Sequence, residues 1–170
     1  FAVAQDRESS GHRYYHAVEV NGLFEFSNIG IGGGAGIHEI HGCQFNPHWV
    51  LAMGVGFDYL YHKGVNYFGE PFKEDDFAFK LYANVRYFIL KERKWTPLIM
   101  LSTGYFGIYE QSVRFRGLSP NNGIWEHGFM ANLFLGANYR FHTHRNLYFG
   151  IVGGFDMPLS GFSIKIGMSF

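Results

Sequence analysis

The chain consists largely of segments in which bulky apolar residues alternate with small or polar ones. In residues 49–61, every odd position from Trp49 to Tyr61 is large and apolar, whereas Ala52, Gly54 and Gly56 lie at even positions. A period of two predicts a β-strand with one face against an apolar environment. The same reasoning predicts eight strands, with a weaker pattern in the second and fifth, at residues 14–26, 35–45, 49–61, 77–89, 97–109, 128–141, 147–157 and 162–170.

The segments between these strands alternate in length. Residues 46–48, 91–96 and 142–146 make short connections, whereas residues 27–34, 62–76 and 110–127 make long ones. The last connection, 158–161, is short and departs from the trend. Short turns at one end and long loops at the other are typical of outer-membrane barrels. We therefore predict an all-β fold, an eight-stranded antiparallel transmembrane up-and-down β-barrel over residues 13–170, with both termini in the periplasm.

The second strand contains a conflict. If Ala35, Ile37 and Cys43 face lipid, the same alternation directs Glu39 to lipid as well. A β-bulge near residues 38–40 would change the alternation and remove the conflict. No residue in this stretch indicates such a bulge, so the sequence leaves the conflict open.

A soluble, lipocalin-like barrel would show the same alternation with its apolar face inward. Its exterior would then be rich in charge, but the polar faces here are largely Gly, Ala, Asn and Ser, and charged residues make up only 16% of the chain. Aromatic residues near the strand ends match the girdles of membrane proteins. These residues are Trp49, Tyr59, Tyr61, Tyr87, Tyr139 and Phe170. The pattern favours a membrane barrel, and no apolar run approaches the roughly 18 residues of a transmembrane helix.

Charged residues on the strands are expected to face the lumen. Lys80 or Arg86 in contact with lipid would cost about 2–4 kcal/mol near the bilayer midplane. The spacing predicts that Asp58 pairs with Lys80 and that Lys165 lies between Asp156 and Glu25. An eight-stranded barrel is only wide enough for its own side chains, so we predict a plugged lumen, with a narrow channel as an alternative. The full predicted lumen network is Glu19, Glu25, Asp58, Lys80, Arg86, Arg140, Asp156 and Lys165.

Two stretches resemble known barrels. The final strand presents Phe162, Ile164, Ile166, Met168 and Phe170 on one face. It resembles the C-terminal signal that the barrel-insertion machinery of Gram-negative bacteria recognises. Residues 41–49 (HGCQFNPHW) and 54–59 (GVGFDY) resemble small outer-membrane barrels of the Bacteroidetes, although Cys43 replaces their usual aromatic. The resemblance implies a barrel similar in architecture to outer membrane proteins X and A, located in the bacterial outer membrane.

The remaining composition narrows the choices further. Ala2-Val3-Ala4 resembles the small-x-small end of a secretory signal peptide, so we assign residues 1–12 to a signal remnant and N-terminal tail. Cys43 is the single cysteine, which excludes an internal disulfide. The formal net charge is zero, which argues against nucleic-acid binding.

Several motifs could indicate a nucleotide-binding, hydrolytic or metal site. Residues 30–35 match the dinucleotide fingerprint G-x-G-x-x-A, but no helical pattern follows. A hydrolytic site would need a histidine beside a serine or a carboxylate, and the candidates are His62 with Asp58 and His127 with Ser119. Metal could bind at His142 and His144 or at His38 and His41, but two ligands are too few for a structural site. We expect no catalytic, cofactor or metal site, with a lipid-modifying enzyme as the alternative.

The long loops carry aromatic residues next to basic ones, a composition typical of recognition surfaces. We therefore expect a structural or interaction role, in which the loops bind a protein partner or a surface glycan, or pack against lipopolysaccharide. Membership in a larger envelope complex is a further expectation. The loop residues concerned are Tyr67, Phe68, Phe72, Arg114, Phe115, Arg116 and Trp125.

Overall fold

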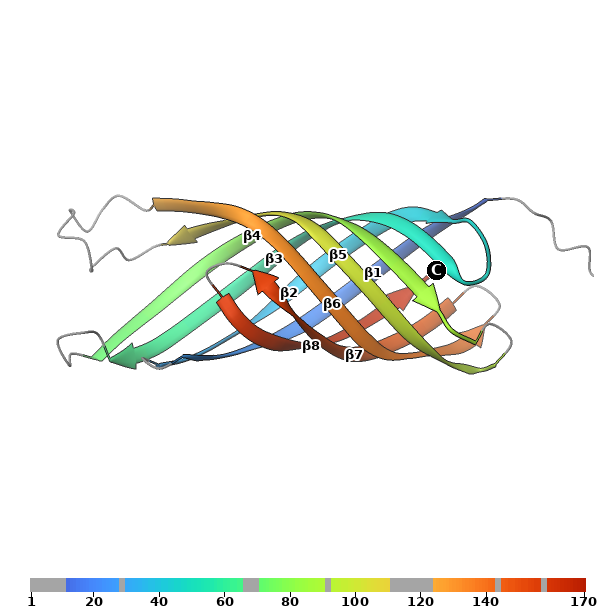
Figure 1. Cartoon of the computed structure of the whole chain (residues 1–170). Helices are drawn as coiled ribbons and strands as arrows, with labels where there is room; N and C mark the ends of the chain where they lie inside the picture. Colours follow the sequence, from blue (N-terminus) through green and yellow to red (C-terminus); the bar gives the residue numbers. More distant parts are fainter. Residues whose placement is uncertain are drawn as a thin grey trace, which may run out of the picture.

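The chain forms a closed antiparallel β-barrel of eight strands, which confirms the predicted fold (Figure 1). The computed structural model describes residues 12–27, 30–65, 71–90, 93–110, 124–142, 145–156 and 159–170. Each strand pairs with the next, and β1 closes the sheet by pairing with β8. The strands are β1 (Arg13–Ser27), β2 (Gly30–Gln44), β3 (Trp49–Val65), β4 (Pro71–Phe88), β5 (Trp95–Glu110), β6 (Ile124–His142), β7 (Arg145–Asp156) and β8 (Leu159–Ser169).

The two ends of the barrel differ. The N-terminal end of β1 and Phe170 lie at the end that carries residues 45–48, which we call the turn end (Figure 1). The backbone amide of Phe170 donates to the carbonyl of His16 there, at 2.9 Å. At the opposite end, which we call the loop end, β3 and β5 end and β4 and β6 begin. The described residues contain no helix that is long and apolar enough to cross a membrane.

The predicted inward and outward faces of the clearer strands are confirmed, and the structure determines the register of β2 and β5, which the pattern left open. In β2, Ala35 and Ile37 lie outside while Gly36 and His38 are buried inside. In β5, Leu101 is exposed and Met100 is buried. The outer surface is therefore apolar and the interior holds the buried charges, the reverse of a soluble barrel.

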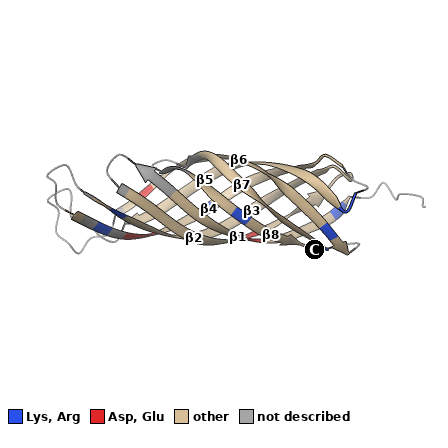
Figure 2. Ribbon diagram, turned by 90° about the horizontal axis from the view of Figure 1, so that it is seen from below, with Lys and Arg blue, Asp and Glu red and all other residues tan. Residues whose placement is uncertain are grey.

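Aromatic side chains gather near both ends of the outer surface. At the turn end, Trp49 packs on Tyr87 with ring centroids 4.5 Å apart, and Trp95 packs on Tyr139 at 4.6 Å. Near the loop end, Tyr59 packs on Phe77 at 5.6 Å. Figure 2 shows Lys, Arg, Asp and Glu mostly toward the two ends, with few in the middle of the barrel. The aromatic pairs thus flank a largely apolar outer band, as interfacial girdles do.

The strands extend further at the loop end than their alternation predicted. Residues 30–34, expected to be loop, pair with residues 23–27 of β1 and residues 60–64 of β3. Residues 62–65 and 71–76, also expected to be loop, form a continuous ladder between β3 and β4. The prediction was wrong here because backbone pairing continues where apolar alternation stops: β-ladders need no apolar side chains once they leave the lipid.

The bulge considered near residues 38–40 is absent. The pairing of β2 with β1 and with β3 is continuous from Gly30 to Gln44. Glu39 consequently lies on the outer surface, exposed over 54% of its side chain, where two histidines accompany it. A bulge was considered only to avoid a lone carboxylate, and those two histidine partners remove the need for it. Among the described pairings, a register shift occurs instead in β6, between Arg140 and His142.

Candidate functional site

The buried carboxylate of Glu19 is the centre of a charge network inside the barrel. Glu19 lies on the inward face of β1 and is 1% exposed. Its Oε1 accepts from Arg86 Nη2 at 2.9 Å and from the Tyr148 hydroxyl at 2.7 Å. Its Oε2 pairs with Lys165 Nζ at 2.7 Å. Residues from β1, β4, β7 and β8 therefore meet at one carboxylate, which links walls of the barrel that are not neighbours in the sheet.

Arg86 makes hydrogen bonds and cation–π contacts with several surrounding side chains. Its Nη1 donates to the Tyr15 hydroxyl and its Nε donates to Asn84 Oδ1, both at 2.6 Å. Its guanidinium also lies over the rings of Tyr15 and Tyr148, at 5.0 and 5.1 Å from their centroids. The side chain is 0% exposed. A buried charge is tolerated only when it is paired and its donors are satisfied, and Arg86 meets both conditions.

A second cluster surrounds Asp58 of β3, closer to the loop end. Asp58 Oδ1 accepts from Asn21 Nδ2 at 3.0 Å and lies 3.0 Å from His38 Nε2. Its Oδ2 pairs with Lys80 Nζ at 3.1 Å, as the sequence predicted. The other ring nitrogen of His38 lies 2.9 Å from the Tyr82 hydroxyl. Both nitrogens of His38 are thereby engaged.

Glycines on the inward faces create the space for these large side chains. Gly36 lies between Asn21 and Asp58 in the ladder, and those two side chains bond across it. A Cβ at Gly56 would lie 2.7 Å from the His38 ring, and one at Gly54 would lie 2.4 Å from the Tyr82 ring. Large side chains therefore lie over neighbouring glycines, the small–large alternation that fills a small barrel.

The lumen differs between the two sides of the charge network, the side toward the turn end and the side toward the loop end. On the turn-end side, the interior is filled by buried side chains, among them the apolar Ile40, Val50 and Phe88 and the polar Thr96, Asn138 and Ser169. On the loop-end side, a cavity of about 70 Å³ remains, which has room for a few water molecules. Its lining includes Leu23, His62, Lys80 and Lys165. The two charge clusters therefore reach this cavity through Lys80 and Lys165.

Five of the eight predicted lumen charges are buried inside the barrel: Glu19, Asp58, Lys80, Arg86 and Lys165. Arg140 lies near the turn end of β6, is partly exposed and makes an interaction of its own. Glu25 and Asp156 belong to β1 and β7, but their side chains lie outside the described part of the chain.

The predicted partner of Lys165 was wrong, because the lysine binds Glu19. The reason is the register between β8 and β1, in which Lys165 lies opposite Asn21 while Glu25 lies further toward the loop end, opposite Gly161. Asp156, at the loop end of β7, lies opposite Leu159, whereas Gly150 lies opposite Lys165. The first and last strands are far apart in sequence, and no local pattern determines this register.

Of the two proposed hydrolytic pairs, one lies within the described residues and the other lies partly outside them. Asp58 bonds Asn21, His38 and Lys80 rather than His62. His127 stacks on Tyr105, with centroids 6.1 Å apart, and Ser119 lies outside the described residues. His38 with Asp58 resembles two thirds of a catalytic triad, but the second nitrogen of His38 contacts Tyr82 and is not free to activate a serine.

Of the two histidine pairs considered as metal ligands, His38 with His41 is divided between the two faces of β2, and His142 with His144 lies partly outside the described residues. His38 faces the lumen and His41 faces outward, because three residues along a strand reverse the face. His142 is exposed and His144 lies outside the described residues. The glycine-rich residues 30–35 form a strand rather than a phosphate-binding loop. A different group, His16, Glu39 and His41, was missed, because the ladder of β1 and β2 brings it together.

Of the predicted loop residues, Trp125 is described. It lies on β6, is 60% exposed, and packs against Tyr109 of β5 with centroids 5.4 Å apart. Phe72 belongs to β4, but its side chain is not described. The others, Tyr67, Phe68, Arg114, Phe115 and Arg116, lie outside the described residues.

No protein-family model and no curated protein sequence matches this chain. Solved structures do match it. Neisserial surface protein A has a TM-score of 0.64 and 12% identity, over 94% of this chain and 97% of its own. Ail, the attachment invasion locus protein of Yersinia pestis solved with the heparin analogue sucrose octasulfate, has a TM-score of 0.59 and 10% identity, over 95% of this chain and 99% of its own. OprG from Pseudomonas aeruginosa has a TM-score of 0.55 and 7% identity, over 95% of this chain and 96% of its own. The fold is that of the small eight-stranded barrels of bacterial outer membranes.

Proposed function

We propose that this chain spans the outer membrane of a Gram-negative bacterium as a closed, non-enzymatic barrel that interacts through its loop end. The apolar outer band with aromatic pairs at both ends supports the membrane location. Because the start of β1, residues 45–48 and Phe170 lie at the turn end, we propose that this end faces the periplasm. The sequence resemblance supports a source in the Bacteroidetes.

The observation that carries the closed lumen is the bridge across it. Arg86 of β4 reaches Glu19 of β1, and Tyr148 of β7 reaches the same carboxylate oxygen. Buried side chains such as Ile40, Val50 and Phe88 fill the interior between this bridge and the turn end. An ion would have to displace paired, buried charges, each of which would be costly to separate.

Planar-bilayer recordings with the purified, folded protein test this proposal. We expect no discrete current steps, because the bridge and these buried side chains exclude ions and water. Insertion must be verified in the same preparation by heat-modifiable gel migration, which reports a folded barrel. Reproducible single-channel steps from inserted protein would establish a narrow channel and overturn the closed lumen.

The same preparation tests the absence of enzymatic activity. We propose that none exists, because the His38–Asp58 pair has no serine on its remaining nitrogen and ends on Tyr82 instead. We expect no turnover of lipid A or phospholipid. Sustained release of a fatty acid from either lipid would favour the alternative of a lipid-modifying enzyme.

The loop end is where we propose that partners bind. Exposed Trp125 and the cation–π pair of Lys73 with Tyr61, at 5.3 Å, combine aromatic and basic groups there. Ail, a barrel of the same fold, was solved with a sulfated sugar. An anionic glycan, the lipopolysaccharide around the barrel or a protein of an envelope complex would each suit such a surface.

Replacing residues 111–123 with a short turn tests the loop end. We expect the shortened barrel to fold, because the replaced residues lie outside the paired parts of β5 and β6. We also expect it to lose the partners that co-purify with the full chain from the native membrane. An unchanged set of co-purifying proteins and glycans would count against a role for this loop.

Phe170→Ala is expected to reduce the amount of assembled barrel in the outer membrane several-fold. The alternating face of β8 resembles the signal read by the insertion machinery, and Phe170 is its last aromatic. In the folded barrel, Phe170 stacks on His16 with centroids 5.6 Å apart. Heat-modifiable migration of membrane fractions measures the folded amount. Phe149→Ala is the control, since Phe149 is similarly exposed on the neighbouring strand, and an equal loss in both variants would contradict a special role for Phe170.

A further inference from the structure

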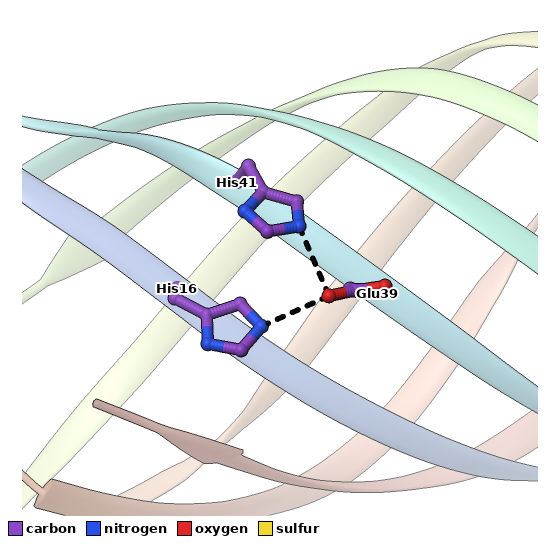
Figure 3. A group of neighbouring side chains, drawn as sticks. All are labelled: His16, Glu39 and His41. Carbon is purple, nitrogen blue, oxygen red and sulfur yellow. Dashed lines mark hydrogen bonds and ion pairs between the residues drawn. The ribbon is translucent and has the colours of Figure 1, made fainter.

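Three polar side chains lie together on the outer surface near the turn end: His16 of β1 with Glu39 and His41 of β2 (Figure 3). His16 is directly opposite His41 in the ladder, and Glu39 lies two residues from His41 on the same face. The ladder neighbours of Glu39 are Val18 and Val55, which are both apolar. A carboxylate in this setting needs a positive partner or strong donors.

The donor atoms of the three residues converge. His16 Nε2 lies 3.2 Å from Glu39 Oε1, and His41 Nε2 lies 3.1 Å from the same oxygen. All three ligand atoms lie within 4.8 Å of one another. Ligands bound at about 2.0–2.1 Å in a tetrahedral zinc site are roughly 3.3 Å apart, so little movement would be needed to admit the ion. Two histidines and one carboxylate are also a common ligand set of zinc sites that keep a fourth position open.

Neighbouring groups hold the histidines in this arrangement. The Tyr14 hydroxyl contacts His41 Nδ1, which directs the other nitrogen of the ring toward Glu39. The rings of His16 and His41 stack with centroids 4.8 Å apart, and Phe170 covers the other side of His16. Metal-binding histidines commonly have such an outer partner on their second nitrogen, which fixes the orientation of the ring. The side chains of Glu39 and His41 remain about half exposed, so an ion can enter from outside.

We propose that His16, Glu39 and His41 form a binding site for a divalent cation of the zinc type on the outside of the barrel. The ligands are Nε2 of each histidine and the carboxylate of Glu39, and a remaining position is open to water or another oxygen donor. The cation would neutralise a carboxylate placed among apolar residues and would join β1 to β2 next to the seam with β8. The site uses no lumen residue and is independent of the proposed function.

Zinc binding to the folded protein in detergent tests the site. The protein is prepared without a polyhistidine tag, stripped with a chelator and dialysed against Zn²⁺, and bound metal is measured by elemental analysis. We expect saturable binding of one Zn²⁺ per chain, weakened at least about tenfold in Glu39→Gln and in His41→Ala, since losing an outer-shell partner alone costs 10–100-fold. The control is His127→Ala, because His127 is also exposed on the outer face and stacked on a ring. It should bind as tightly as the wild type.

Cobalt binding to the wild type and to the Tyr14→Phe variant distinguishes a metal site from a cluster that is only hydrogen-bonded. Co²⁺ in place of Zn²⁺ should give visible absorption bands of low-coordinate cobalt, absent in Glu39→Gln and retained but with about tenfold weaker binding in Tyr14→Phe. Heat-modifiable migration verifies that each variant is folded. If His41→Ala does not fold, the isosteric Glu39→Gln decides. No saturable binding to the wild type, or an equal loss in His127→Ala, would overturn the proposal.

Discussion

Glu19→Gln is expected to lower the free energy of unfolding of the barrel by about 3–5 kcal/mol, the range for breaking a buried ion pair by removing one partner. The carboxylate faces Arg86, Lys165 and the Tyr148 hydroxyl, all within 2.9 Å. A glutamine has the same shape but no charge, so two buried cations would lose their anion. The side-chain amide of the glutamine would also point its N–H groups at the donors of Arg86, Lys165 and Tyr148. Urea unfolding in phospholipid vesicles, followed by tryptophan fluorescence, measures the change.

Glu39→Gln, measured with a chelator present, is the matched control for this experiment. It makes the same chemical change on the neighbouring strand but on the outer surface, where ion pairs contribute about 0–1 kcal/mol. The double variant Glu19→Gln/Lys165→Met should recover part of the lost stability, because it removes one of the two stranded cations. Equal effects of Glu19→Gln and Glu39→Gln would show that the lumen network does not stabilise the barrel.

The fold was predictable because its signal is local. Alternation with a period of two is visible within most segments, whereas β5 is apolar on both faces and only the structure shows Met100 inside and Leu101 outside. The membrane setting reinforced the signal, since the outside must be apolar over its whole height. The strand ends were not predictable in the same way, because the ladder continues into residues 62–65 and 71–76 without an apolar face.

The site was predictable only in part, since partners depend on register between strands. Asp58 and Lys80 were paired correctly because β3 and β4 are consecutive strands: Asp58 lies opposite Ala78, two residues from Lys80, and the lysine side chain still reaches it. Lys165 was paired incorrectly because β8 meets β1 across the closure of the barrel. The inward position of His38 was available from the alternation of β2, but its histidine spacing suggested a metal pair with His41 instead. The grouping of His16 with His41 likewise required the register of β1 and β2.

Gly36→Ala is expected to destabilise the barrel by about 3 kcal/mol, a combination of overpacking and the loss of bonds to a buried charge. A Cβ at this position would lie 1.6 Å from Asp58 Oδ1 and 3.0 Å from Asn21 Oδ1. The aspartate could move aside only by giving up Asn21 and His38, and Lys80 would then face a displaced anion. Because the glycine separates the two side chains that bond across it, a single methyl group tests whether the Asp58 cluster is rigid.

Gly153→Ala is the control for this change and is measured by the same urea unfolding. A Cβ there meets nothing within 4 Å, and the residue lies on the outer face of β7. Alanine at this position should change stability by less than about 0.5 kcal/mol, as for surface substitutions away from structural constraints, or raise it slightly because glycine is unfavourable within a strand. If Gly36→Ala is as stable as Gly153→Ala, the Asp58 cluster adjusts freely, and the closed lumen must then depend on the Glu19 network and the buried side chains on its turn-end side alone.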